Sequence, residues 1–227
     1  MANIPNVILV HGAWADGSSW AKVIPLLQAQ ALSVTAVQLP LTSFENDLAT
    51  ARRAIALVDG PIVLVGHSYG GAVITETGTD PNVAALVYIA AFAPDVGQSA
   101  GSLGASVAPA PMAEHVRPDK EGYLKLTAAG IKENFAQDLT DVEKNVLFAT
   151  QAPTSGASLG GNVTAAAWKS KPSSYLVTTL DRAIRPELQR TMAKTIRAKT
   201  IEVASSHVAM LSHPQETAHL IIEAASR

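Results

Sequence analysis

One serine of the sequence stands in a setting that could make it a nucleophile. The pentapeptide Gly66-His67-Ser68-Tyr69-Gly70 fits the pattern G-x-S-x-G. It follows the apolar run 62–65 and precedes the small residues of 69–78, which predicts a sharp turn from a strand into a helix. Glycines suit such a turn because a Cβ on either flank would clash. The turn would lift the Ser68 hydroxyl clear of a sheet, at the carboxyl ends of its strands.

A serine hydroxyl attacks a carbonyl carbon only when a base takes its proton, and His207 is the candidate base. It comes just after the apolar run 200–204, so it would also lie at the carboxyl end of a strand. The other five histidines suit the role less well. They are expected at the start of the last helix or within it (His213, His219), in strand-end loops where they support the backbone (His11, His67), and exposed (His115).

The base in turn needs a carboxylate that holds its tautomer and stabilises the imidazolium. Asp181 follows the apolar run 175–180 and would lie at a third strand end. Asp95, just after the run 83–91, is the alternative, although a cap or loop role would also explain it. Position favours Asp181, and the chain order Ser68, Asp181, His207 is the order that G-x-S-x-G hydrolases use.

Acyl transfer also needs hydrogen-bond donors for the negative oxygen that develops on the carbonyl. The backbone N–H of Tyr69, directly after the nucleophile, is one expected donor. The second should come from the loop after the first strand, with Ala13 as the first candidate and Trp14 as the next. Gly12 leaves room for the substrate carbonyl, so Gly12 and Trp14 are expected to line the substrate pocket.

Strands and helices alternate in a way that would bring these residues together. Near-continuous apolar runs typical of strands buried on both faces occupy 7–10, 34–39, 62–65, 83–91, 174–180 and 200–204. Helical spacing of apolar residues occupies 19–31, 45–58, 69–78, 186–196 and 214–225. This alternation predicts an α/β fold, an open six-stranded parallel sheet with helices on both faces.

The alternation of predicted strands and helices stops between residues 95 and 170. Two stretches rich in Gly, Ala and Ser, 97–111 and 153–167, enclose helical pieces around 123–135 and 142–150, and no strand is expected there. Long connections of this kind are usually lids or binding loops. We therefore expect a core of residues 1–94 and 171–227, with 95–170 as a helical cap inserted after the fourth strand.

Composition narrows the function classes. A chain of 227 residues with 48% hydrophobic residues suits one folded domain, and a net charge of −2 argues against a nucleic-acid or anionic-membrane surface. The absence of cysteine excludes disulfides, thiolate metal sites and a Cys nucleophile. Residues 1–5 show no signal-peptide pattern, and the longest apolar run, 83–94, is too short to span a bilayer. The expectation is a cytoplasmic monomer or homodimer that needs no metal or cofactor.

Four segments resemble one branch of the α/β-hydrolase superfamily, which holds plant methylesterases, hydroxynitrile lyases and many small bacterial esterases. They are Val7-Ile8-Leu9-Val10-His11-Gly12-Ala13-Trp14, then 63–71, then Thr179-Leu180-Asp181-Arg182 with Ile184 and Pro186, and finally 206–211. The resemblance covers nearly the whole chain and is weakest across the cap. It implies the α/β-hydrolase fold and the triad Ser68, Asp181 and His207.

The same comparison separates two chemistries. Hydroxynitrile lyases of this branch place a Thr in the first loop and a Lys just after the catalytic His, whereas the matching positions here are Gly12 and Val208. The resemblance therefore implies a carboxylesterase-type serine hydrolase that cleaves small esters through an acyl-enzyme. The alternatives are a hydroxynitrile lyase-like enzyme or C–C bond hydrolase with the same triad, and a non-catalytic ligand receptor.

Overall fold

Six parallel strands form the central sheet of the computed structural model, which describes residues 5–226. Their order across the sheet is β2-β1-β3-β4-β8-β9. Every residue of β1 and β3 is buried, because helices cover both faces of the sheet. The predicted α/β architecture with six parallel strands is confirmed. The strands are β1 (Asn6–Val10), β2 (Ser33–Ala36), β3 (Ile62–His67), β4 (Val83–Ile89), β8 (Ser173–Thr178) and β9 (Lys199–Val203).

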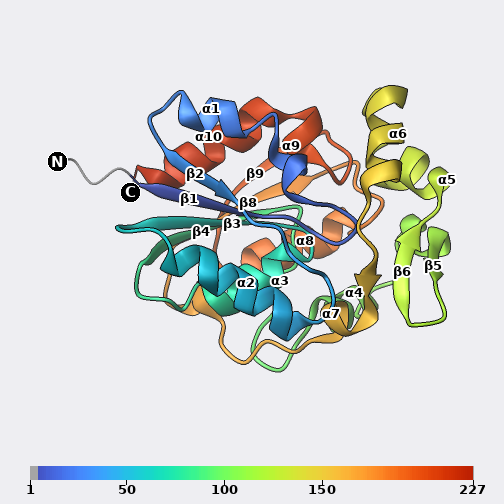
Figure 1. Ribbon diagram of the computed structural model, residues 1–227, viewed down its shortest axis with the longest axis horizontal. Helices are drawn as coiled ribbons and strands as arrows, with labels where there is room; N and C mark the ends of the chain where they lie inside the picture. Colours follow the sequence, from blue (N-terminus) through green and yellow to red (C-terminus); the bar gives the residue numbers. More distant parts are fainter. Residues whose placement is uncertain (1–4, 227) are drawn as a thin grey trace.

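Helices cover the two faces in separate layers (Figure 1). One layer holds α1 (Ile24–Gln28) and α10 (Pro214–Ala225), and the other holds α2 (Phe44–Ala56), α3 (Gly70–Thr77) and α8 (Pro186–Thr195). Their starts follow local chemistry. Ser43 caps α2 by accepting the Asn46 N–H at 3.2 Å, and proline opens both α8 and α10, where its missing N–H costs nothing.

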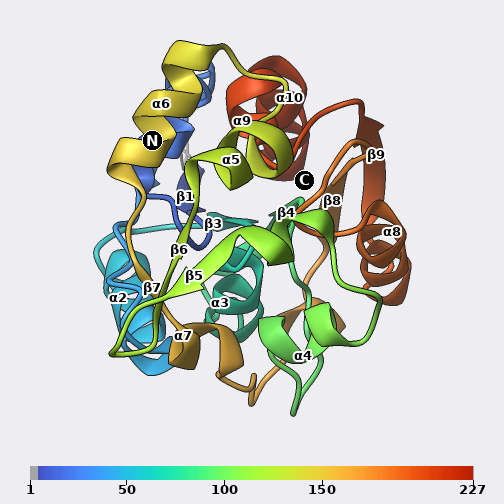
Figure 2. The same cartoon turned by 90° about the vertical axis from the view of Figure 1, so that its right-hand side faces the viewer.

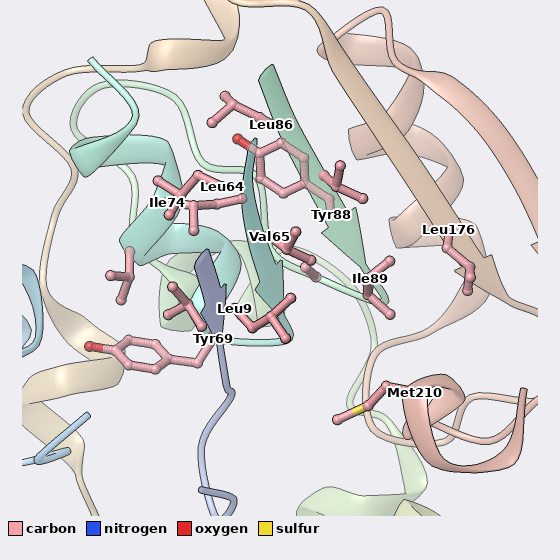
Figure 3. Packing of buried hydrophobic residues seen from close by; sticks show 14 of the residues in the cluster. Leu9, Leu64, Val65, Tyr69, Ile74, Leu86, Tyr88, Ile89, Leu176 and Met210 are labelled. Atoms are coloured by element: carbon pink, nitrogen blue, oxygen red, sulfur yellow. The ribbon is translucent and has the colours of Figure 1, made fainter. Parts of the chain in front are cut away.

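The core lies between the sheet and these layers. Figure 3 shows Leu64 and Val65 of β3 beside Tyr88 and Ile89 of β4, with Ile74 of α3 next to Leu64. All five side chains are fully buried. A sheet packed in this way holds its strand ends in fixed positions, and the candidate catalytic residues lie at those ends.

Most of the segment between β4 and β8 lies beyond the carboxyl ends of the strands, and its last part runs back along α3 to the start of β8 (Figures 1 and 2). It contains a small antiparallel sheet, β5-β6-β7, made of Val116–Pro118, Tyr123–Leu126 and Thr154–Ser155. The helices around this sheet are α4 (Ala100–Ala105), α5 (Ala128–Gly130), α6 (Asp141–Thr150) and α7 (Gly156–Gly160), with a 3₁₀-helix at Pro111–His115, a π-helix at Ile131–Phe135 and a 3₁₀-helix at Ala167–Lys169. The division of the chain at residues 94 and 171 stays a prediction.

The expectation that 95–170 holds no strand was wrong, and so was the helical piece expected at 123–126. A turn at Asp119 explains the hairpin. Its Oδ1 accepts the N–H groups of Glu121 and Tyr123, both at 2.9 Å, and Gly122 adopts a φ of +83°. These contacts reverse the chain between β5 and β6.

Two sequence expectations concern the membrane. Between residues 5 and 226, no helix is long and apolar enough to cross a bilayer. The expectation of no signal peptide rests on residues 1–5, and residues 1–4 lie outside the described part of the chain.

Candidate active site

Ser68 lies in the turn between β3 and α3, with a φ of 53°. This left-handed conformation costs a non-glycine residue about 1–2 kcal/mol, so the surroundings must hold it. Backbone hydrogen bonds do so: Ser68 N donates to Ile89 O at 3.2 Å, and Ser68 O accepts from Phe92 N at 3.1 Å. Gly70 is required on the helix side, since a Cβ there would come within 2.6 Å of the carbonyl oxygens of Val10 and His11.

His207 and Asp181 form a buried pair behind Ser68. The distance from His207 Nδ1 to Asp181 Oδ2 is 2.7 Å, and the two side chains are 1% and 0% exposed. A carboxylate at Nδ1 fixes the tautomer that leaves Nε2 free to accept a proton. The pair therefore has the arrangement expected of a general base and its orienting acid.

Four further donors hold the Asp181 carboxylate. Its Oδ1 accepts the backbone N–H groups of Ala183 at 2.7 Å and Ile184 at 2.9 Å. Its Oδ2 accepts from Thr178 Oγ1 at 2.8 Å and from Gln189 Nε2 at 2.7 Å, besides His207. Hydrogen bonds to both oxygens leave the carboxylate a single orientation.

Sequence reasoning missed Gln189. This fully buried side chain of α8 donates to Asp181 and to Ile184 O at 2.8 Å, while its Oε1 accepts Thr178 N at 3.0 Å. The sequence offered a weak signal: Gln189 lies eight residues after Asp181, in the first turn of the helix predicted at 186–196. A buried amide there needs polar partners, and the end of β8 supplies them.

The ring of His207 is packed from two sides. The ring of Phe135 lies 5.2 Å away and that of His67 lies 4.7 Å away, between centroids. His67 Nε2 is 2.9 Å from the His207 carbonyl oxygen, which can only accept, so Nε2 carries the proton. Burial lowers the pKa of His67 well below 6.5, and the neighbouring His207 acts in the same direction. His67 is thus a neutral support for the base.

A residue of the segment between β4 and β8, which we call the cap segment, holds Ser206, the residue before His207. Ser206 N donates to Asp138 Oδ2 at 2.8 Å. Asp138 lies between the π-helix and α6, so the loop that carries His207 is tied to the segment above it.

Ser68 and His207 line one small cavity of about 150 Å³. Its walls are mostly apolar, which suits the non-reacting parts of an organic substrate. Ala13, Trp14 and Tyr69, predicted as site residues, also line it, whereas Gly12, predicted to line the pocket, is not among its walls. The other walls are Phe92, Ala100, Gly101, Gly104, Met112, Leu159, Ala183 and Ile184.

The loop after β1 distinguishes the two candidate oxyanion donors. Trp14 N already donates to Thr154 Oγ1 at 3.0 Å, so this N–H is engaged. Within residues 5–226, the N–H groups of Ala13 and Tyr69 donate to no other protein atom. Gly12 packs so closely on the nucleophile that a Cβ would lie 2.6 Å from Ser68 Cβ. The loop therefore has room for glycine and no room for the Thr of the lyases.

The Tyr69 side chain serves the interior rather than the cavity. Its hydroxyl donates to Asp47 Oδ2 at 2.6 Å, and Asp47 Oδ1 accepts Leu41 N at 2.8 Å. Burial raises the pKa of Asp47 and that of Tyr69. Figure 3 shows the Tyr69 ring directed away from the central strands, which leaves its backbone N–H at the turn.

The alternative acid and the other histidines have different contacts. Asp95 is an exposed residue that forms an ion pair with Lys169 and accepts Val96 N at 2.7 Å. His11 lies between Gly12 O at 2.8 Å and Leu39 N at 2.9 Å and supports the backbone. The remaining three contact residues of their own segments: His115 with Thr127, His213 with Ser212, and His219 with Glu223.

No group of three or more His, Cys, Asp or Glu side chains that could hold a metal ion occurs between residues 5 and 226. The polar groups around Ser68 are one imidazole, one carboxylate and backbone donors, which together with the hydroxyl form the composition of a nucleophilic site. This composition matches acyl-transfer chemistry.

Residues 7–220 match the alpha/beta hydrolase family. The chain belongs to this family. Among curated relatives, it is 25% identical to probable hydrolase R7 of Phoma sp., over 97% of this chain and 98% of that protein. It is 28% identical to methylesterase 8 of Arabidopsis thaliana, over 82% of this chain and 76% of that one. Relatedness to plant methylesterases, predicted from the four segments, is confirmed.

Solved structures show the same fold. The crystal structure of a pyrethroid hydrolase from Sphingobium faniae JZ-2 superposes with a TM-score of 0.84, at 24% identity, and covers 98% of both chains. The likeness extends over the segment between β4 and β8 as well as the sheet. At this level of identity it establishes the architecture and leaves the substrate open.

Proposed function

We propose that this α/β-hydrolase is a carboxylesterase that cleaves small carboxylic esters through an acyl-enzyme. The observation that carries the proposal is the buried 2.7 Å contact between His207 Nδ1 and Asp181 Oδ2, with His207 and Ser68 lining one cavity. The methylesterase named above is a relative whose name describes ester cleavage, which supports the same reaction class.

The first half of the reaction forms the acyl-enzyme. Ser68 Oγ attacks the ester carbonyl carbon while His207 Nε2 takes the hydroxyl proton. The carbonyl electrons move onto oxygen, and the N–H groups of Ala13 and Tyr69 stabilise that oxyanion. The tetrahedral intermediate then collapses, the C–O bond to the alcohol breaks, and His207 returns its proton to the departing alkoxide. The products are free alcohol and acylated Ser68.

The second half regenerates the enzyme. Water gives a proton to His207 Nε2 and attacks the acyl carbon, and the same donors stabilise the second oxyanion. Collapse breaks the bond to Ser68 Oγ, which recovers the proton from His207 and releases the carboxylic acid. Asp181 keeps its charge throughout and stabilises the imidazolium in both halves.

Hydrolysis of p-nitrophenyl acetate, butyrate and octanoate tests the proposal. We expect turnover by the wild type, loss of about 10³-fold or more in Ser68→Ala, and a rate that falls on acidification because a protonated His207 cannot act as base. Asp95→Asn, which alters the alternative acid, should keep wild-type turnover, whereas Asp181→Asn should lose about 10³-fold or more. Ester turnover that survives in Ser68→Ala would reject the proposal.

A further inference from the structure

A second hollow adjoins the catalytic cavity. It has a volume of about 460 Å³ and lies between the chain that follows α4 and the start of α8. We call it the annex. Five residues line both spaces and form the junction between them: Phe92, Gly104, Met112, Ala183 and Ile184.

The annex is a built part of the molecule, since hydrogen bonds hold its opposite walls together. Met112 N donates to Arg182 O at 3.0 Å. Arg185 Nε donates to Ala108 O at 2.8 Å, and a terminal nitrogen of the same guanidinium donates to Pro109 O at 2.6 Å. The loop 182–185 is itself fixed by Asp181 through the Ala183 and Ile184 N–H groups. The annex thus keeps a fixed position relative to the triad.

The chemistry of the annex is that of a hydrocarbon site. Met112, Ile184 and Leu188 form a buried floor, and Arg185 is the one charged residue among those that line the hollow. Its guanidinium is engaged with the two carbonyl oxygens of the opposite wall. No acidic side chain lines the annex, and the side chains of its alanines, two valines and one proline are apolar.

The two volumes together indicate what occupies the annex. Small-molecule sites usually measure about 300–1,000 Å³, and the catalytic cavity alone falls below that range. The two neighbouring volumes taken together fall within it. Building on the proposed function, we infer that the substrates are esters with an extended apolar arm, alkyl or aryl, which lies in the annex while the ester group lies at Ser68.

Gly104 offers a direct test, because it lies at the junction and an added Cβ would meet only the Phe92 ring at 3.7 Å. Gly104→Phe should therefore fit and obstruct the passage. Gly160→Phe, on α7, makes the same change at an exposed glycine with nothing within 4 Å and serves as the matched control. Ala113→Phe, which fills the annex from a residue that lines only that space, is the second variant.

The measurement is the ratio of kcat/KM for p-nitrophenyl octanoate to that for p-nitrophenyl acetate. Each methylene buried in the annex can raise affinity about threefold to fourfold, so the wild-type ratio should exceed about 10. Gly104→Phe and Ala113→Phe should lower the ratio at least about tenfold, and Gly160→Phe should keep it. Comparing octyl acetate with ethyl acetate then shows whether the arm belongs to the alcohol rather than the acyl half.

The annex and the esterase proposals can fail separately. A wild-type ratio near 1 for both pairs, octanoate against acetate and octyl against ethyl acetate, or ratios that neither phenylalanine variant changes, would overturn the annex while leaving ester cleavage intact. Should the wild type cleave none of these esters, the annex can still be tested by calorimetry, which measures the binding of p-nitrophenyl octanoate to Ser68→Ala. Affinity at least about tenfold weaker in Ser68→Ala with Gly104→Phe supports the annex, and equal affinity overturns it.

Discussion

At the scale of single residues, the orientation of the base depends on a side chain outside the triad. Gln189 donates to the same Asp181 oxygen that accepts from His207. Both Gln189 and Asp181 also form hydrogen bonds with the hydroxyl of Thr178. A hydrogen bond to a charged group contributes about 1.5–3 kcal/mol. Gln189 is thus a positioning residue, which acts on the substrate only through Asp181 and His207.

Replacing Gln189 by leucine should lower kcat/KM about 10- to 100-fold, chiefly through kcat, because Asp181 loses a donor and His207 loses its fixed orientation. Gln189→Glu should lower it further, since it places a second carboxylate beside Asp181. Steady-state kinetics across pH check this, with exposed Gln28→Leu as control. A change confined to KM, or a loss equal to that in the control, would show that Gln189 is merely structural.

The positions of Ser68, Asp181 and His207 could be predicted because each follows an apolar run, and the carboxyl ends of parallel strands meet at one edge. Gln189 could not be placed in the same way. Its role arises only when α8 packs against β8, and no local pattern marks a buried amide as a partner of a particular carboxylate. His67 was expected to support the backbone, but no pattern in the sequence indicates that its partner is the His207 carbonyl.

At the scale of elements, Trp14 joins the loop after β1 to the small sheet of the cap segment. Its indole Nε1 donates to Leu124 O of β6 at 2.9 Å, and its backbone N donates to Thr154 of β7. Trp14 lines the catalytic cavity, so these bonds hold one of its walls in place. The loop and the small sheet therefore depend on each other.

Trp14→Phe should keep the aromatic wall and remove the bond to Leu124. We expect a stability loss of about 1 kcal/mol in urea unfolding and faster limited proteolysis within 116–155. Trp168→Phe is the matched control, because Trp168 Nε1 donates to Pro94 O at 2.9 Å away from that sheet. Equal cleavage of 116–155 in both variants would contradict the role of Trp14.

The six long strands could be predicted because a buried strand of a parallel sheet reads as an unbroken apolar run. The small sheet could not, because its strands have three, four and two residues, and residues 116–118 and 123–125 are partly or fully exposed. β6 also pairs with residues about thirty positions further on, a contact that local periodicity does not encode.

At the scale of the whole molecule, two buried histidines couple folding to pH. Burial lowers the pKa of His67 well below 6.5 and lowers that of His11. Below about pH 6.5 the unfolded chain binds protons that these rings do not bind in the folded state. The free energy of unfolding should therefore decrease as the pH is lowered below about 6.5. The decrease is up to about 1.4 kcal/mol per pH unit for each ring and ends when the pH reaches the lowered pKa of that ring.

His67→Gln keeps a donor near the His207 carbonyl and removes the titrating ring. Urea unfolding should show that the wild type loses more stability than this variant between about pH 6.5 and pH 5, by at most about 1.4 kcal/mol per pH unit. The raised pKa of Asp47 affects both proteins equally, so it cancels in the difference. Parallel stability curves for the two proteins would show that His67 titrates normally.

The central claim is that the acyl group passes through Ser68, and trapping that intermediate tests it most directly. The enzyme is mixed with p-nitrophenyl acetate, quenched in acid within the first turnover, and digested for mass spectrometry. The account predicts a burst of p-nitrophenol and an acetyl group on Ser68 in the wild type, with both absent in Ser68→Ala. Turnover without an acetylated Ser68, or with the acetyl group on another residue required for turnover, would contradict it.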